Sequence, residues 1–169
     1  TFHPGVTHPG QYLDDVITTK LNFIHFTDTE LSGNDLSVLS GSLSLCEVTL
    51  SDCRIAEGAF RQLNNLPNLQ SLDIVDCQVT PHDEIDFPSF PKLKLLDLSG
   101  SLFADQLLSR IPGHAVLNEI HLDSSSVTDG GMQHLHQLPR LETLSVKRTK
   151  VTGQGLSKLG APLINLNLG

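Results

Sequence analysis

The sequence predicts an α/β fold of stacked repeats, and three observations support that prediction. An apolar pattern returns at a constant spacing along most of the chain. Inside each copy, apolar and polar residues alternate with a period of two, which is typical of a half-buried strand. Several segments between the copies, such as "DGGMQHLHQL", instead space their apolar residues by three or four, as a short helix does.

The pattern is eleven residues long and is best seen in "LETLSVKRTKV". Six full copies start at residues 21, 45, 69, 93, 117 and 141, and a partial seventh, "LINLNLG", starts at 163. The first, fourth, sixth and eleventh positions are apolar. The ninth position is always small, being occupied in turn by Thr29, Cys53, Cys77, Ser101, Ser125 and Thr149.

This L-x-x-L-x-L-x-x-(C/T/S)-x-L pattern resembles the leucine-rich repeat, whose signature carries Asn or Cys at the ninth position. The segments that follow the pattern, such as "VTDGGMQHLHQL", resemble the cysteine-containing and short bacterial branches of that family. The resemblance implies a right-handed α/β solenoid. A parallel β-sheet would line its concave face, and short helices or irregular segments would cover its convex face.

The repeats divide the chain into two parts. Residues 21–169 form the predicted leucine-rich repeat domain, and residues 1–20 are predicted to be an N-terminal capping segment. The end of the chain carries no such cap in sequence, because "LINLNLG" stops inside a strand. We therefore expect an unpaired strand edge there, and either more protein follows in the native chain or the edge pairs with a second copy in a homodimer.

The convex segments are predicted to differ between repeats. Helices are expected in "EGAFRQLNN", "ADQLLSRI" and "DGGMQHLHQL", with Asp105 and Asp129 placed to act as N-caps. The third repeat instead contains "TPHDEIDFPSFPK", whose prolines exclude an interior helical turn. We expect irregular chain there, with Phe87 and Phe90 filling the core in place of helical leucines.

The third, fifth, seventh, eighth and tenth positions of each copy are predicted to face the concave side, which solenoids commonly use for binding. The candidate binding residues are Phe23, His25, Asp28, Asp52, Asp73, Asp76, Asp97, His121, Asp123, Lys147, Arg148 and Lys150. This surface is acidic in its first four repeats and basic in the sixth. Stacked aspartates repel one another, which favours a binding role over solvated turn residues, although both interpretations remain open.

Other chemistry fits this sequence less well. Asp73 and Asp97 share a column on neighbouring strands, but a glycosidase also needs a cleft lined with aromatic rings. A weak calcium site among the aspartates at 52, 73, 76 and 97 is a second alternative. Cys53 and Cys77 are expected to be buried, reduced thiols, with Cys46 near the surface. We predict no catalytic residues, no metal and no cofactor.

Charge and composition restrict the partner and the compartment. The net charge of −8 disfavours nucleic acid and anionic membranes, and no apolar run approaches the length of about 18 residues that spans a bilayer. Three cysteines and no glycosylation sequon favour a reducing or bacterial setting, and the lack of a signal or transmembrane segment in this sequence favours the cytoplasm. The predicted function is non-enzymatic recognition of a protein partner. Two alternatives remain: a targeting module of a larger enzyme or effector, and a structural, self-assembling spacer.

Overall fold

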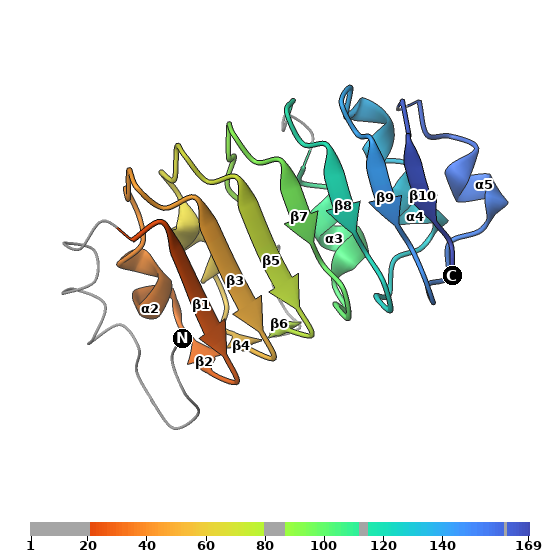
Figure 1. The fold of residues 1–169 in the computed structure, drawn as a ribbon. Helices are drawn as coiled ribbons and strands as arrows, with labels where there is room; N and C mark the ends of the chain where they lie inside the picture. The colour runs from red at the N-terminus through yellow and green to blue at the C-terminus, as the bar shows by residue number, and fades with distance from the viewer. Residues whose placement is uncertain (1–20, 80–86, 112–114, 161) are drawn as a thin grey trace.

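A seven-stranded parallel sheet runs the length of the molecule (Figure 1), as seen in a computed structural model that describes residues 21–79, 87–111, 115–160 and 162–169. The strands, in spatial order, are β1 (Phe23–Thr27), β3 (Glu47–Ser51), β5 (Ser71–Val75), β7 (Leu95–Asp97), β8 (Glu119–His121), β9 (Thr143–Ser145) and β10 (Asn165–Asn167). Spatial order follows chain order, so each repeat adds one strand beside the previous one. The predicted α/β solenoid is confirmed.

The strand register follows the sequence period. Thr49 lies opposite Asp73, 24 residues further along the chain. The final step, from Thr143 to Asn165, is shorter at 22 residues, like the last repeat of the sequence. Because the register equals the repeat length, equivalent positions of successive repeats form straight columns across the sheet.

The fourth and sixth positions point into the core, as the alternation predicts. All eight residues predicted to be buried there are at most 4% exposed. They are Leu72, Ile74, Leu96, Leu98, Ile120, Leu122, Leu144 and Val146. Since no repeat can enclose its own leucines, this core is continuous from one repeat to the next.

A second, three-stranded sheet was not predicted. It consists of β2 (Glu30–Leu31), β4 (Arg54–Ile55) and β6 (Gln78–Val79), so within the described residues it accompanies only the first three repeats. Its strands cover the tenth and eleventh positions of the pattern. The eleventh residues Leu31 and Ile55 are buried, which explains why this position is apolar.

The convex side carries short helical elements (Figure 1). They are α2 (Gly33–Ser37), η1 (Phe60–Leu63), α3 (Ala104–Leu108), α4 (Asp129–Met132), η2 (Leu135–Gln137) and α5 (Gly153–Leu156). Helical chain occurs in all three segments where it was expected, but "EGAFRQLNN" forms a 3-10 helix. Among the described helices, none is long and apolar enough to cross a membrane.

The expected capping role of Asp105 and Asp129 is wrong in detail. Thr128 is the N-cap of α4, because its hydroxyl accepts a hydrogen bond from the backbone N–H of Gly130, and Asp129 is the first helical residue. Asp105 instead accepts two hydrogen bonds from Thr128 of the next repeat, at 2.9 Å from the backbone N–H and 2.6 Å from the hydroxyl. The aspartate therefore links neighbouring repeats.

The same link recurs one repeat later. Asp129 accepts from the backbone N–H of Thr152 at 2.7 Å and from its hydroxyl at 2.6 Å. Hydrogen bonds from that hydroxyl and that backbone hold the pKa of Asp129 below its ordinary value. The links also explain two glycines: a Cβ at Gly131 would lie 2.1 Å from Asp105 Oδ1, and one at Gly155 would lie 2.4 Å from Asp129 Oδ1.

Aromatic rings occupy the convex core near the third repeat. Phe87 and Phe90 are buried as predicted, with ring centroids 5.4 Å apart. Phe87 also packs edge-on against Phe60 at 6.4 Å. No helix occurs in the described residues 87–94, which agrees with the expectation of irregular chain. The rest of that segment, residues 80–86, and the predicted cap at residues 1–20 lie outside the described residues.

Candidate binding surface

The exposed side of the large sheet, called the sheet face below, carries the third, fifth and seventh positions of each repeat. The alternation that buries the fourth and sixth positions turns these side chains outward. Seven of the predicted binding residues lie here: Phe23, His25, Asp73, Asp97, His121, Asp123 and Lys147. The prediction omitted two acids of the third column, Glu47 and Glu119, which the same alternation places on this face.

The eighth and tenth positions do not share the sheet face, which corrects the prediction for five residues. Asp28, Asp52, Asp76 and Arg148 occupy the turns that follow the strands, called the turn rim below. Lys150 lies two residues past its turn. The predicted basic cluster is thus divided, because only Lys147 of its three members faces the same side as the strands' outward residues.

Backbone geometry gives a structural reason for the aspartates of the turn rim. The φ angles of Asp28, Asp52 and Asp76 are 49°, 55° and 52°, in the left-handed region that aspartate tolerates better than most residues. The next residue in the column is Gly100, with φ of 72°. A Cβ there would lie 1.9 Å from Asp76 Oδ1, so this turn requires glycine.

The turn rim also continues the hydrogen-bond ladder of the sheet. The backbone N–H groups of Asp28 and Asp52 donate to the carbonyls of Ser51 and Val75, both at 3.0 Å. That pairing fixes the turns whether or not a ligand is bound. These backbone roles weaken the expectation that repulsion between stacked aspartates favours a binding role, and that role stays a prediction.

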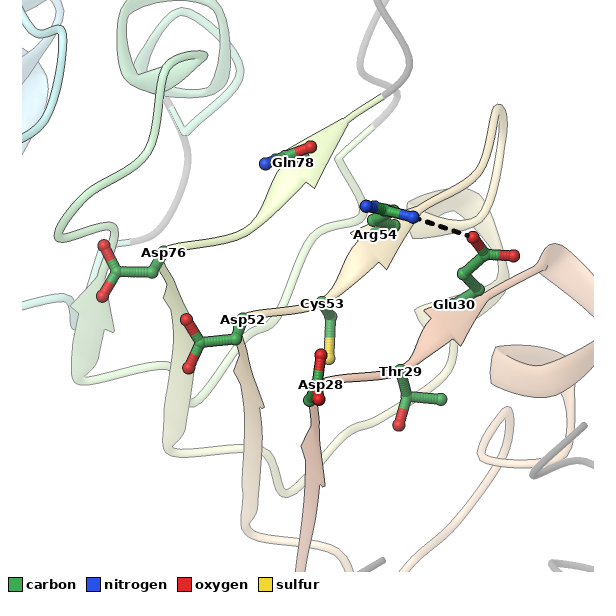
Figure 2. A pocket seen from close by; sticks show the side chains of 8 residues that line it. All are labelled: Asp28, Thr29, Glu30, Asp52, Cys53, Arg54, Asp76 and Gln78. Carbon is green, nitrogen blue, oxygen red and sulfur yellow. Dashed lines mark hydrogen bonds and ion pairs between the residues drawn. The ribbon is translucent and has the colours of Figure 1, made fainter. Parts of the chain in front are cut away.

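A polar depression of about 360 Å³ lies between the turn rim and the small sheet. Figure 2 shows the three rim aspartates on one side of it and Glu30, Arg54 and Gln78 on the other. Arg54 Nη1 pairs with Glu30 Oε1 at 3.3 Å, both side chains being largely exposed. An exposed pair of this kind contributes little to stability.

The carboxylates considered for calcium are split between two surfaces. Asp52 and Asp76 lie on the turn rim, whereas Asp73 and Asp97 lie on the sheet face. Within the described residues, no group of three or more His, Cys, Asp or Glu side chains is placed to hold a metal ion.

The ninth position is a column of hydrogen-bond donors that are buried in the first five repeats. The hydroxyl of Ser101 donates to the carbonyl of Ile74 in the preceding repeat at 3.0 Å, and the Cys77 thiol donates to that of Leu50 at 3.4 Å. Cys53 and Cys77 are buried, unpaired thiols, as predicted, and Cys46 is partly exposed. Contact with the Cys53 thiol, followed by burial, raises the pKa of Cys77 far above its ordinary value, which keeps it protonated.

Acidic side chains gather around a histidine in the middle of the sheet face. His121 Nε2 lies 2.9 Å from Glu119 Oε1, and Nδ1 lies 3.6 Å from Asp97 Oδ2. Asp73 is the cross-strand neighbour of Asp97 on the other side. We call Asp73, Asp97 and Glu119 the acidic centre. The sequence alone places Asp73, Asp97 and His121 in one column. It does not predict that the His121 ring pairs with two carboxylates.

The pKa of Asp73 is shifted by its surroundings in the acidic centre. Burial, followed by repulsion from Asp97, raises the pKa of Asp73, although hydrogen bonds from the hydroxyls of Ser71 and Thr49 oppose the shift. Both hydroxyls lie 3.3 Å from its carboxylate. A cation from a partner would relieve this repulsion.

Asp123 and the backbone of Lys147 take part in hydrogen bonds that stabilise the fold. Asp123 Oδ1 accepts hydrogen bonds from the Ser145 hydroxyl at 2.6 Å and from the backbone N–H of Lys147 at 2.9 Å. Desolvation raises the pKa of Asp123, but these two hydrogen bonds and the charges of Lys147 and His121 outweigh it, so the net pKa lies below the ordinary value. Arg148 also contributes to the scaffold, since its Nε donates to Ser124 Oγ at 2.9 Å.

Comparisons with known proteins agree on the architecture. The structure resembles the secreted internalin-like protein Lmo2445 from Listeria monocytogenes, with a TM-score of 0.62 and 19% sequence identity. The alignment covers 92% of this chain and 55% of that protein. At this identity the likeness concerns the fold.

In sequence, the chain is 30% identical over 99 residues to protein NLRC5 of Mus musculus. That match covers 54% of this chain and 5% of the relative, so this chain corresponds to a small part of it. No family model matches the sequence.

Proposed function

Because the chain has the leucine-rich repeat fold, we propose that it is a non-enzymatic recognition module that binds a protein partner through its sheet face. Proteins of this fold generally mediate protein–protein recognition. The observation that carries the proposal for this chain is the acidic centre. Burial and then the neighbouring charge of Asp97 raise the pKa of Asp73, and a cationic partner group would offset the repulsion between these two carboxylates.

The sheet face is favoured over the turn rim because its charges have fewer structural roles. The rim aspartates meet a backbone requirement for positive φ, and the convex aspartates at 105 and 129 link repeats. By contrast, nothing in the strand geometry requires acids at Glu47, Asp73 or Glu119, where many polar residues suit a half-exposed strand position.

A photo-cross-linking experiment tests this assignment within a single repeat. The residue p-benzoyl-phenylalanine would replace Leu95 on the sheet face, Leu102 past the turn rim, or Gln106 on convex helix α3, in separate proteins. After irradiation in an extract of the source organism, we expect a protein adduct from position 95 and none from position 106. Adducts from position 102 or 106 alone, or none from any position, would contradict the proposal.

Self-assembly is a second candidate function, favoured by the outer edge of β10. Every residue of this strand is exposed, and Leu166 and Leu168 are 41% and 54% exposed although they continue the core columns of the repeat. An exposed strand edge beside apolar side chains can pair with a second copy. In the alternative in which this segment targets a larger enzyme or effector, the sheet face would still provide the recognition.

Light scattering separates self-assembly from monomeric recognition. The dimer hypothesis predicts twice the mass of the 18.4 kDa chain at concentrations of tens of micromolar, on the order typical of weak association. Leu166→Lys should restore the monomer mass, while Leu102→Lys, an exposed control, should not. A monomer mass at every concentration would rule out this candidate.

A further inference from the structure

A second charged groove lies where the strands begin, at the edge of the large sheet opposite the turn rim. Its volume is about 360 Å³, and its charged residues are Lys92, Lys94, Arg140 and Glu142. Three cations face one carboxylate, so the groove is basic. We call it the strand-start groove. It formed no part of the surface predicted from sequence.

Two of the three cations of the strand-start groove, Lys92 and Lys94, are held in place by hydrogen bonds but are not neutralised. Lys92 Nζ donates to Asn68 Oδ1 at 2.6 Å, and Lys94 Nζ donates to Gln70 Oε1 at 3.1 Å. Both acceptors are neutral amides. In the described part of the chain, no carboxylate lies within salt-bridge distance of Lys92, Lys94 or Arg140. The groove therefore presents positive charge, and two of its three cationic side chains already have preferred positions.

Strand β7 connects this groove to the acidic centre. Lys94 immediately precedes β7, and Asp97 ends it three residues later. At about 3.3 Å per residue, the two positions lie about 10 Å apart along the strand. Opposite charges at this separation create a field that runs along the strands.

We propose that the strand-start groove and the acidic centre form one bipolar site for an extended segment of a protein partner in the polyproline II conformation, in which an acidic and a basic side chain three residues apart point to the same side. The acidic side chain lies in the groove against Lys94 and Arg140, and the basic side chain lies over Asp73, Asp97 and Glu119. This inference rests on the proposed function and specifies the partner for the same face.

Charge complementarity selects this kind of occupant. A nucleic acid or another polyanion would satisfy the groove but would be repelled by the acidic centre. A uniformly basic segment would be repelled by Lys92, Lys94 and Arg140. Only a segment with both signs in the right order and at the right spacing is favoured at both places, because like charges brought together oppose binding.

Three short peptides, acetylated and amidated, provide the test. The first is Glu-Pro-Pro-Lys, which has the proposed spacing and prolines between the charges that favour the polyproline II conformation. The second, Glu-Lys-Pro-Pro, has the same composition with adjacent charges. The third, Glu-Pro-Pro-Gln, lacks the cation. Each would be titrated into the isotopically labelled chain, and binding would be followed through backbone amide shifts of β7 and its neighbours.

We expect the first peptide to bind about twofold to fivefold more tightly than either of the others, the range for one exposed ion pair. Lys94→Gln and Arg140→Gln should each weaken it by a similar factor, whereas Lys158→Gln, on the convex side, should not. Equal binding of the first and third peptides, binding insensitive to Lys94→Gln, or no binding at millimolar concentration would overturn the inference.

The two proposals fail separately. If the peptides do not discriminate but the cross-linker at position 95 still captures a partner, the sheet face remains the binding surface and only the bipolar site is wrong. If the cross-linker captures a partner only from positions 102 or 106, the proposed function is wrong whatever the peptides do.

Discussion

The first three repeats and the last three use the same sheet but are joined differently behind it. In the first three, the backbone ladder continues past the turn rim into the small sheet, where Arg54 N–H donates to the Thr29 carbonyl at 3.0 Å. In the later repeats the small sheet is absent from the described residues. There, the links from Asp105 to Thr128 and from Asp129 to Thr152 connect neighbouring convex segments through side chains.

This difference shows which parts of a repeat depend on particular side chains. A backbone ladder tolerates many residues, so the tenth position can be Glu30, Arg54 or Gln78. A side-chain link requires its own residues and also a glycine to make room for the carboxylate. The core columns are common to both halves, and substitutions in them should have the largest effects.

The largest effect is expected for Leu96→Ala, in the strand where the two halves meet. Leu96 is fully buried, so its truncation should lower the free energy of unfolding by about 2–5 kcal/mol. Chemical denaturation would measure the loss. Leu102→Ala, at a residue 77% exposed, is the matched control and should change stability by no more than about 0.5 kcal/mol. A loss below about 0.5 kcal/mol for Leu96→Ala would mean that the strand register is wrong.

A smaller effect is expected for the links in the second half. Asp105→Ala removes two hydrogen bonds to Thr128, a helix N-cap, and should cost about 1–2 kcal/mol in urea denaturation. Arg54→Ala is the corresponding change in the first half and should cost at most about 0.5 kcal/mol, since its ion pair is exposed. Equal losses in the two variants would remove the distinction between the halves.

Gly131→Ala tests whether the link between Asp105 and Thr128 requires a glycine at position 131. The new methyl group would collide with the Asp105 carboxylate, so the substitution should destabilise the protein although alanine normally favours a helix. In an Asp105→Ala background the collision with the carboxylate is gone while the 3.1 Å contact with Val127 Cγ2 remains, so the cost should fall by at least about 1 kcal/mol, a coupling typical of residues in contact. A cost for Gly131→Ala that is independent of residue 105 would show that the link is not what requires glycine.

The smallest effect is a gain in stability from Asp73→Asn. Because the pKa of Asp73 is raised in the folded state, its contribution to stability is present below the unfolded pKa and is lost as the pH rises through the folded pKa. At pH 7 the uncharged asparagine should therefore add about 0.2–1 kcal/mol, the size of a cross-strand charge effect. Thermal melts should show the gain disappearing below about pH 3.9. A loss of stability at pH 7 would contradict the inferred repulsion from Asp97.

The repeat scaffold can be read from the sequence because its signals are periodic. The constant spacing of the repeats and the alternation of their apolar positions predict the strands, the core columns and the burial of Cys53 and Cys77. Prolines in the third repeat correctly indicate irregular chain in its described part. These features depend on local pattern alone, which a single sequence contains.

The turns and the links between repeats cannot be read in the same way. The alternation of inward and outward side chains does not continue through Asp52 and Arg54. The positive φ of Asp52 ends it and turns the chain toward the small sheet. The strands of that sheet are only two residues long, as β4 shows. The partner of Asp105 lies 23 residues away, in another repeat. The strand-start groove was missed because Lys94 and Arg140 belong to different repeats and approach only when these stack.

The sheet face, rather than the turn rim, is the proposed binding surface, and two matched double variants test this choice. Asp73→Asn with Glu119→Gln removes two charges from the acidic centre. Asp52→Asn with Asp76→Asn removes two from the rim and keeps side chains that tolerate positive φ. Association would be measured with the purified partner that the cross-linker captures. We expect the first double variant to slow association about fivefold to tenfold at low salt, because complementary charge acts mainly on the encounter rate. The second double variant should change the association rate less than about twofold. Slower association with the rim variant and an unchanged rate with the sheet-face variant would contradict the account.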